Sequence, residues 1–186
     1  MADKPRILHS GKDMLWSLIP LLVICAFVAI ASGNCSVGLT GQAGDDQTPD
    51  FDVTTALQAD ARDLTFPIRL PDTPDGWKPN SGSTVPVGGT MVSNAGWISE
   101  VGAYVQLSQT DAAEDDLVVH LGDGDALGTG TRQVAGREWV TYVTAEEQKF
   151  WITDLGDVRI AVLSRGPDED MATLATATLA KEPLPA

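Results

Sequence analysis

The most constraining feature of this chain is the apolar run from Met14 to Ser32, which contains no charged residue. At 1.5 Å per residue, a helix of about nineteen residues nearly spans the roughly 30 Å hydrocarbon core of a bilayer. Lys4, Arg6 and Lys12 precede the run, and no charged residue follows it until Asp45. Because basic residues stay on the cytoplasmic side, we expect a single transmembrane helix with the amino terminus inside and all later residues outside.

A cleaved signal peptide is the main alternative, because Ala29, Ile30 and Ala31 match the small-x-small pattern of a cleavage site. The run is longer than the about 7–15 apolar residues usual in signal peptides. Trp16 also stands at the inner boundary, where aromatic residues anchor spanning helices. We therefore favour a retained anchor at the plasma membrane, and both interpretations export the same domain.

The two cysteines do not predict an intramolecular disulfide. Ten helical residues would separate Cys25 from Cys35 by about 15 Å, beyond the roughly 7 Å limit between the Cα atoms of a disulfide. Asn34 stands where a lipoprotein signal has a small residue, so lipid attachment to Cys35 is disfavoured. Cys35 is then either an intermolecular disulfide partner or a free thiol at the membrane surface.

Charge narrows the partners that the exported part can bind. The whole chain carries a formal net charge of −14, and the part after Ser32 carries about −15. This charge excludes nucleic acid, which needs surfaces rich in lysine and arginine, and disfavours flat adhesion to anionic lipids. We interpret it as a solubility feature.

Composition divides the chain into five segments. Residues 1–13 are expected to be a cytoplasmic tail, 14–32 the transmembrane helix, 33–52 a flexible linker rich in Gly and Asp, 53–181 one extracytoplasmic domain, and 182–186 a proline-containing tail.

Patterns in the first half of the domain alternate between helix and strand. Apolar residues at helical spacing predict a helix over Thr54–Leu64, and a short strand is expected at Phe66–Leu70 before the turn-rich sequence LPDTPDGWKP. Met91–Ser99 is expected to be extended. Strict alternation over Val101–Leu107 predicts a half-buried strand.

Asp111 and Glu114 have the spacing of a capping box and predict the start of a helix. Its expected buried face carries Ala113, Leu117, Val118 and Leu121, and the glycine-rich LGDGDALGTGT breaks it. Three strands in a meander are then predicted at Arg137–Thr144, Lys149–Leu155 and Val158–Ser164.

The last element is expected to be a helix whose acidic residues, Asp168 to Asp170, suit a helix amino terminus. Its buried stripe is Met171, Leu174, Ala175 and Leu179. Together the patterns predict an α+β fold, in which an antiparallel sheet has helices packed on at least one face.

Four segments carry a family resemblance: RILHSGKDMLWSLIP, ADARDLTFPIRLPDTPDGWKPNS, GAYVQLSQTDA and VLSRGPDEDMATLATATLA. They resemble the actinobacterial membrane-anchored "domain of unknown function 4245" family. The resemblance implies an actinobacterial cell envelope and a single-pass architecture, and it brings no catalytic residue. Phe66 to Trp77 is also similar to the opening of Mog1/PsbP-like domains, an analogy at the level of fold alone.

No motif in the sequence predicts catalysis. His120 is the only histidine after the apolar run, so it lacks partners for a histidine metal site or a serine triad. Nucleophile-elbow, Walker and HExxH motifs do not occur in the sequence. Asp123 and Asp125 could begin a calcium loop, but Leu127 and Thr131 follow where an EF-hand needs ligands. We expect no catalytic residue, no cofactor and no metal site, and interpret the acidic residues from Glu114 to Asp116 as complementing a helix dipole.

Four tryptophans, Trp77, Trp97, Trp139 and Trp151, could line an apolar ligand cleft, but residues of this type in strands usually pack across the sheet. We therefore expect a non-enzymatic interaction or accessory domain with an envelope or membrane protein as partner. The alternative is an extracytoplasmic binder of a small apolar or envelope-derived ligand.

The topology is directly testable. A reporter that works only outside the cytoplasm should be active when fused after Ala186, and the full-length protein should stay in the membrane after carbonate extraction. A soluble form beginning at Ser32 would contradict the retained anchor.

Overall fold

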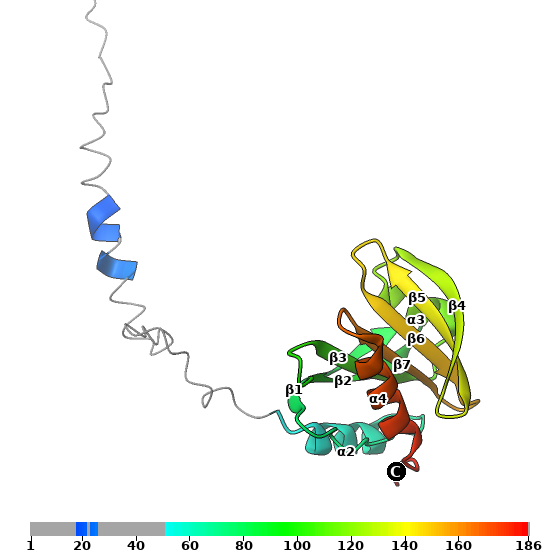
Figure 1. Ribbon diagram of the computed structural model, residues 1–186. Coiled ribbons are helices and arrows are strands. Elements are labelled where there is room, and N and C mark those ends of the chain that lie inside the picture. Colours follow the sequence, from blue (N-terminus) through cyan, green and yellow to red (C-terminus); the bar gives the residue numbers. More distant parts are fainter. Residues whose placement is uncertain (1–17, 22, 26–50, 186) are drawn as a thin grey trace, which may run out of the picture. The chain divides into compact units, whose positions relative to one another are not determined.

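The computed structural model describes residues 18–21, 23–25 and 51–185 (Figure 1). Residues 18–21 and 23–25 are helical with exposed side chains. No helix among these described residues is long and apolar enough to cross a membrane. Most of the predicted spanning segment, the cytoplasmic tail, Cys35 and nearly all of the predicted linker lie outside the described residues.

Residues 51–185 form a seven-stranded sheet with neighbouring strands antiparallel, in the order β1-β2-β3-β7-β6-β5-β4 (Figure 1). The strands are β1 (Lys78–Val87), β2 (Thr90–Ile98), β3 (Tyr104–Thr110), β4 (Ala126–Val134), β5 (Arg137–Thr144), β6 (Lys149–Asp154) and β7 (Arg159–Ser164). The helices are α2 (Val53–Asp63), α3 (Glu114–Leu121) and α4 (Asp168–Leu179). The predicted α+β fold with an antiparallel sheet is confirmed for this part of the chain.

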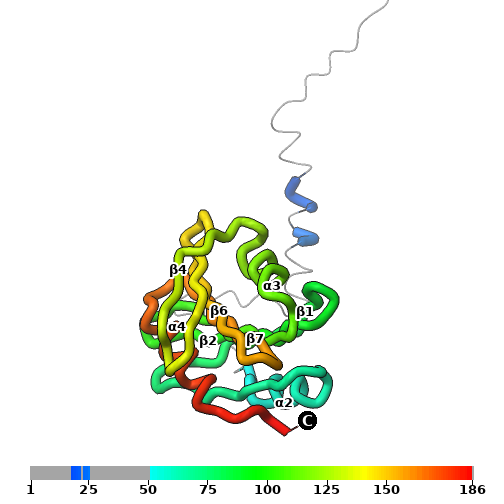
Figure 2. Tube along the Cα trace, turned by 90° about the vertical axis from the view of Figure 1, so that its right-hand side faces the viewer, coloured from blue at the N-terminus to red at the C-terminus, as the bar shows by residue number. Residues whose placement is uncertain are grey.

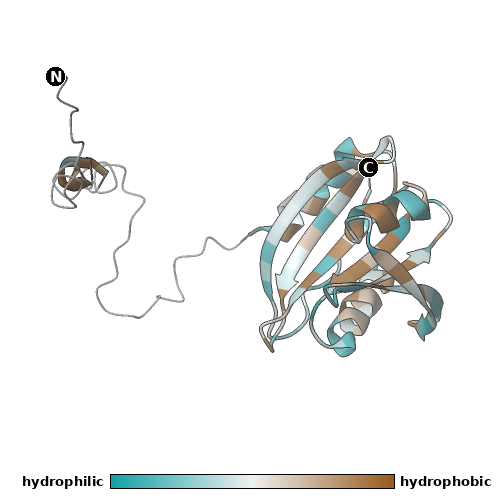
Figure 3. Cartoon of the chain, turned by 90° about the horizontal axis from the view of Figure 1, so that it is seen from above, coloured by the Kyte–Doolittle hydropathy of each residue, from teal (hydrophilic) through white to brown (hydrophobic). Residues whose placement is uncertain are grey.

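Helices α2 and α4 cover one face of the sheet. Leu57 of α2 and Leu174 of α4 belong to the larger hydrophobic cluster, which also contains the buried tryptophans 97, 139 and 151. Side chains alternate between faces along a strand, so Ile160 and Val162 of β7 join this cluster. Hydrophobic and polar stretches accordingly alternate along the strands in Figure 3.

Helix α3 covers the opposite face, and in Figure 2 it lies on the other side of β2 and β7 from α2. Leu117 and Leu121 of α3 pack with Val92, Phe150 and Ile152 in a second cluster. An eight-residue helix is only about 12 Å long, whereas seven strands extend over roughly 29 Å. Helix α3 therefore covers the second face only in part.

Most predicted elements occur within one or two residues of their expected bounds. The first helix, the extended segment at Met91–Ser99, the three strands of the carboxy-terminal meander and the last helix are all present. Asp168 to Asp170 occupy the first turn of α4, and Met171, Leu174 and Ala175 are buried on its inner face. Asp52, which the sequence analysis did not single out, caps α2 by accepting a 3.0 Å hydrogen bond from the backbone N–H of Thr55.

The capping box at Asp111 is wrong. Helix α3 begins after Ala113, without a side-chain cap, and the exposed Ala113 is not part of its buried face. Asp111 instead accepts a hydrogen bond from the hydroxyl of Thr90, because the chain leaving β3 passes the start of β2.

The strand predicted at Phe66–Leu70 is also wrong, since only an isolated bridge from Arg69 to Pro183 forms there. Proline at position 67 cannot donate to a strand ladder. The buried side chain of Gln109 replaces the missing partner strand: its Oε1 accepts from the Arg69 N–H at 2.8 Å and its Nε2 donates to the Arg69 carbonyl at 2.9 Å. Phe66 and Ile68 can therefore be buried in the core without belonging to the sheet.

Neither edge strand, β1 or β4, was predicted from the sequence. β1 contains Pro79 and Pro86, and β4 contains Gly128 and Gly130, so neither shows the alternation of a half-buried strand. The strand predicted over Val101–Leu107 also began too early. Val101 is 69% exposed and lies in the turn that precedes β3.

Replacement of Gln109 tests whether its side chain stabilises the Arg69 segment in place of a neighbouring strand. We expect Gln109→Leu to destabilise the protein by about 1–3 kcal/mol, because it leaves the Arg69 backbone groups without partners. Chemical denaturation measures this loss, and Gln133→Leu, at an exposed position of β4, is the matched control. Equal stability of the two variants would contradict the role of Gln109.

Candidate functional site

Five uncharged polar side chains gather on the second face of the sheet, the face on which α3 packs. They come from three adjacent strands and are Ser81 of β1, Asn94 of β2, and Tyr104, Gln106 and Ser108 of β3. Strand register brings them together, because Asn94 lies opposite Ser108 and Gly96 lies opposite both Ser81 and Gln106. We call this set the polar floor.

The polar floor is one connected hydrogen-bond network. The Tyr104 hydroxyl donates to Gln106 Oε1 and lies 3.1 Å from the Ser81 oxygen, which can donate to it in turn. Gln106 Nε2 donates at 3.0 Å to both Asn94 Oδ1 and Ser108 Oγ, and Ser108 Oγ donates to Asn94 Oδ1 at 2.6 Å. The side chains are thus held in place before any ligand arrives.

The absence of a side chain at Gly96 makes room for the Tyr104 ring on the polar floor. A methyl group at Gly96 would clash with the Tyr104 ring and hydroxyl and with Ser81 Oγ. The missing side chain at position 96 is therefore what lets the aromatic ring lie close to the strands.

Tyr104 also lines a cleft of about 340 Å³ at the edge of the floor, together with Ala103, Gln148, Leu163, Arg165 and Gly166. Gln148 and Arg165 also line a second cleft of about 270 Å³, which extends to Leu121, Asp123 and Asp125 at the end of α3. The Gln148 side chain donates to the Leu121 carbonyl at 3.0 Å and so ties the β5–β6 turn to α3. We call the polar floor and these two adjoining clefts the groove.

Arg165 stands on the rim of the groove and is paired. Its guanidinium donates to the Glu146 carboxylate at 2.6 Å, and both side chains are largely exposed. Such exposed pairs stabilise a fold only weakly, so the pair mainly neutralises the rim.

A larger hollow of about 590 Å³ lies between the Asp72–Asp75 segment and α4. Its α4 side consists of small residues such as Ala172 and Thr173. Because no network of buried polar side chains converges on this hollow, we regard the groove as the better candidate for a binding site.

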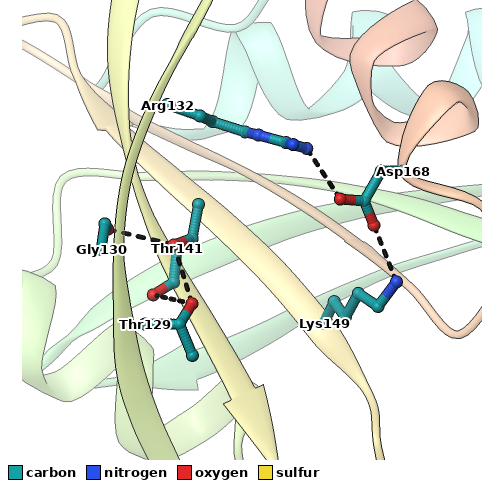
Figure 4. Close-up of polar contacts among 6 residues, drawn as sticks. All are labelled: Thr129, Gly130, Arg132, Thr141, Lys149 and Asp168. Atoms are coloured by element: carbon teal, nitrogen blue, oxygen red, sulfur yellow. Dashed lines mark hydrogen bonds and ion pairs between the residues drawn. The ribbon is translucent and has the colours of Figure 1, made fainter.

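A charged cluster lies on the opposite face of the sheet, where α4 begins (Figure 4). Arg132 of β4 and Lys149 of β6 donate to separate oxygens of Asp168, at 3.0 and 2.8 Å, and Arg132 stacks 3.9 Å above the Trp151 ring. The hydrogen bond from Lys149 is the main cause that lowers the pKa of Asp168. This cluster fastens α4 to the β4–β6 half of the sheet and does not enter the groove.

Beside it, Thr141 donates to the Gly130 carbonyl at 3.0 Å and lies 2.8 Å from the Thr129 hydroxyl (Figure 4). These contacts span the bulge in β4 between Gly128 and Gly130. They replace ladder hydrogen bonds that the bulge interrupts.

The structure separates the candidate residues of the sequence analysis. His120 is exposed on α3 and does not line the groove, whereas Asp123 and Asp125 line its outer cleft. No group of three or more His, Cys, Asp or Glu side chains within residues 18–21, 23–25 and 51–185 is arranged to hold a metal ion. Glu114 has a specific partner, because it accepts a 2.6 Å hydrogen bond from Tyr142; burial, and secondarily this bond, raises the pKa of Tyr142 to about 12.

Three of the four tryptophans are core residues. Trp97, Trp139 and Trp151 are at most 2% exposed, and Trp77 packs against the same cluster. The indole N–H of Trp97 donates to Thr73 and that of Trp139 to the Val134 carbonyl, as expected for buried indoles. They therefore do not form an apolar ligand cleft.

The polar floor was not predicted, because polar residues at every second position are typical of any strand with one solvent-facing side. Asn94 and Gly96 alternate with Ala95 and Trp97 in β2, and Gln106 and Ser108 alternate with Val105 and Leu107 in β3. The sequence does contain this period of two, but it does not reveal that three strands bring the positions together.

Residues 51–185 thus form a small α+β domain with an uncharged polar floor on one face of its sheet. The chain belongs to the family described as "Protein of unknown function (DUF4245)", whose model matches residues 6–178. No curated protein and no solved structure matches the chain, so the likeness to Mog1/PsbP-like domains stays a prediction.

Asp168 predicts a pH-dependent contribution to stability. Because folding lowers its pKa, its ion pairs stabilise the protein above the unfolded value of about 3.9, and the contribution disappears as the pH falls through the folded value. At pH 7 we expect Asp168→Asn to cost about 0.5–1 kcal/mol, since the pairs are partly exposed. As the pH is lowered from 7 to 3, the melting temperature of Asp168→Asn should approach that of wild type. The control Asp157→Asn, at an exposed turn, should match wild type throughout this range.

Proposed function

We propose that this protein is a single-pass membrane protein of the actinobacterial cell envelope whose extracytoplasmic domain is a non-enzymatic interaction module. The uncharged run from Met14 to Ser32 and the basic residues before it support the anchor and its orientation. The family match from residue 6 onward includes this run, which supports treating it as part of the protein's architecture.

The observation that carries the binding role is the preordered polar floor. Ser108 is 1% exposed and Asn94 9%, and both are linked by hydrogen bonds through Gln106 to Tyr104, which lines the 340 Å³ cleft. Buried polar side chains are costly unless they are satisfied, and a fully connected network keeps them in one geometry. A rigid polar surface next to a cleft is suited to recognising a partner.

The chemistry of the floor favours binding over catalysis. Neither serine is next to a base: Ser108 donates to the Asn94 amide oxygen, and Ser81 contacts the Tyr104 hydroxyl. A serine nucleophile needs a neighbouring group that accepts its proton. Non-enzymatic binding is therefore the function that the groove supports best.

The alternative of a small apolar ligand loses its main argument, because the tryptophans on which it rested lie in the core. An envelope-derived polar ligand is compatible with the groove.

Complementation of a deletion strain tests the proposed function. The double variant Tyr104→Phe with Gln106→Ala removes two members of the network at partly exposed positions, and we expect it to reach the membrane folded but to complement poorly. Gln133→Ala is the matched control, and it should complement fully, as should His120→Ala. Full complementation by the double variant, or loss of function in a folded His120→Ala protein, would contradict the proposal.

Capture of partners from membranes complements this test. Full-length protein, cross-linked in intact cells, should retain envelope components that the double variant does not, at equal expression. Identical captured material from both proteins would show that the groove is not the interaction surface.

A further inference from the structure

We infer that the groove binds a neutral, hydroxyl-rich ligand of the oligosaccharide class. This inference rests on the proposed function, because it assigns a ligand class to the same surface.

The first observation is an amide left open at the centre of the floor. Asn94 is 9% exposed, and its Oδ1 accepts hydrogen bonds from Gln106 and Ser108. Its Nδ2 donates to no group among the residues that the structure describes. Asn94 Nδ2 is not among the fully buried atoms without a partner, so it reaches solvent at the surface of the floor. A solvent-facing donor on a side chain that is otherwise held in place marks a point where a ligand oxygen would be bound.

The second observation is the mixture of donors and acceptors on the floor. Both Nε2 protons of Gln106 are used within the network, whereas Gln106 Oε1 accepts from Tyr104 alone among the described residues and has a second lone pair available. The open Asn94 amide supplies donors. A hydroxyl group donates and accepts at the same time, so a polyol can satisfy both kinds of site at once.

Charge excludes ionic ligands from the floor. All five of its side chains are uncharged, and the guanidinium of Arg165 on the rim is already paired with Glu146. The net negative charge of the chain repels anions, and the only carboxylates lining the groove, Asp123, Asp125 and Glu146, lie in its outer cleft. A neutral ligand is therefore the one that the floor accepts without an unpaired charge.

Tyr104 supplies the aromatic surface that such a ligand needs. Its side chain is 36% exposed and lines the 340 Å³ cleft beside Leu163, while its hydroxyl belongs to the network. An aromatic ring with a polar tip can pack against the apolar face of a sugar ring and hydrogen-bond to its edge. The cleft volume lies at the lower end of the roughly 300–1,000 Å³ found for small-ligand sites.

An extended peptide fits the floor less well. Peptides that bind sheets usually add a strand to a free edge. Asn94, Gln106 and Ser108 lie on β2 and β3, which are paired on both sides. Their backbone groups are therefore engaged, and only side chains are available for recognition.

Binding can be measured on the full-length protein in a detergent without a sugar head group, since maltoside detergents would compete. An array of neutral and acidic oligosaccharides is followed by calorimetry of the neutral binders. We expect binding of neutral oligosaccharides that persists in 0.5 M NaCl, as expected for uncharged contacts. If no neutral oligosaccharide binds, or if only acidic ones do, the inference is overturned.

Two variants examine the floor by different routes. Asn94→Asp keeps the acceptor position but replaces the open amide with a carboxylate, and we expect at least a tenfold loss of affinity. Asn80→Asp, with the same change in charge at an exposed position of β1, is the matched control and should bind as wild type does. Gly96→Ala should also weaken binding by displacing the Tyr104 ring, and it remains informative if Asn94→Asp does not fold.

The outcomes separate this inference from the proposed function. If floor variants fail to complement while the wild-type protein binds no neutral oligosaccharide, the groove keeps its role and the ligand class is wrong. A peptide or protein that alone competes for the floor would likewise overturn the ligand class. If floor variants complement fully, the proposed function fails as well.

Discussion

The pairing of β3 with β7 joins the two halves of the sheet, and both faces of the domain depend on its register. Six residue pairs connect the strands, from Val105 opposite Ser164 to Thr110 opposite Arg159. Because side chains alternate, this register places Leu107 beside Val162 in the core and Gln106 beside Leu163 on the groove face. A slip of one residue would exchange the two sets of partners and destroy both the core and the floor.

Unequal cover of the two faces then decides where the domain can bind. Helices α2 and α4 pack over the first face, and Gln109 fastens the segment around Arg69 to it. The short α3 reaches only part of the second face, where Leu117 meets Phe150 and Ile152. The strands on this face carry polar side chains that are joined in one hydrogen-bond network, so the face exposes no large apolar patch there.

The charged cluster around Asp168 and the groove have separate roles. Arg132 and Lys149 converge on one carboxylate at the start of α4, where the helix dipole also favours negative charge. This cluster stabilises the attachment of α4 to the first face. The groove on the second face contains no comparable charge pair on its floor, which matches its assignment to a neutral ligand.

The elements with strong local signals were predictable from the sequence. Helical spacing identified α2 and α4, alternation identified β3, and residues typical of strands identified the β5–β7 meander. Together these signals sufficed to predict an α+β fold. The predicted membrane topology likewise rests on composition alone, namely on the uncharged run before residue 33. Family membership also follows from the sequence, since the model matches residues 6–178.

The edge strands, the Gln109 contact and the groove depend instead on contacts between residues far apart in the sequence. β1 and β4 have weak strand patterns because proline and glycine are tolerated at edges, so their pairing partners determine their conformation. Gln109 and Arg69 are forty residues apart, a contact that no local period encodes. The polar floor combines residues 81 to 108 from three strands, and its polar positions resemble ordinary solvent-facing ones until strand register and the short α3 place them together. Local propensity acts over a few neighbouring residues, whereas a binding surface depends on which distant residues the sheet makes adjacent.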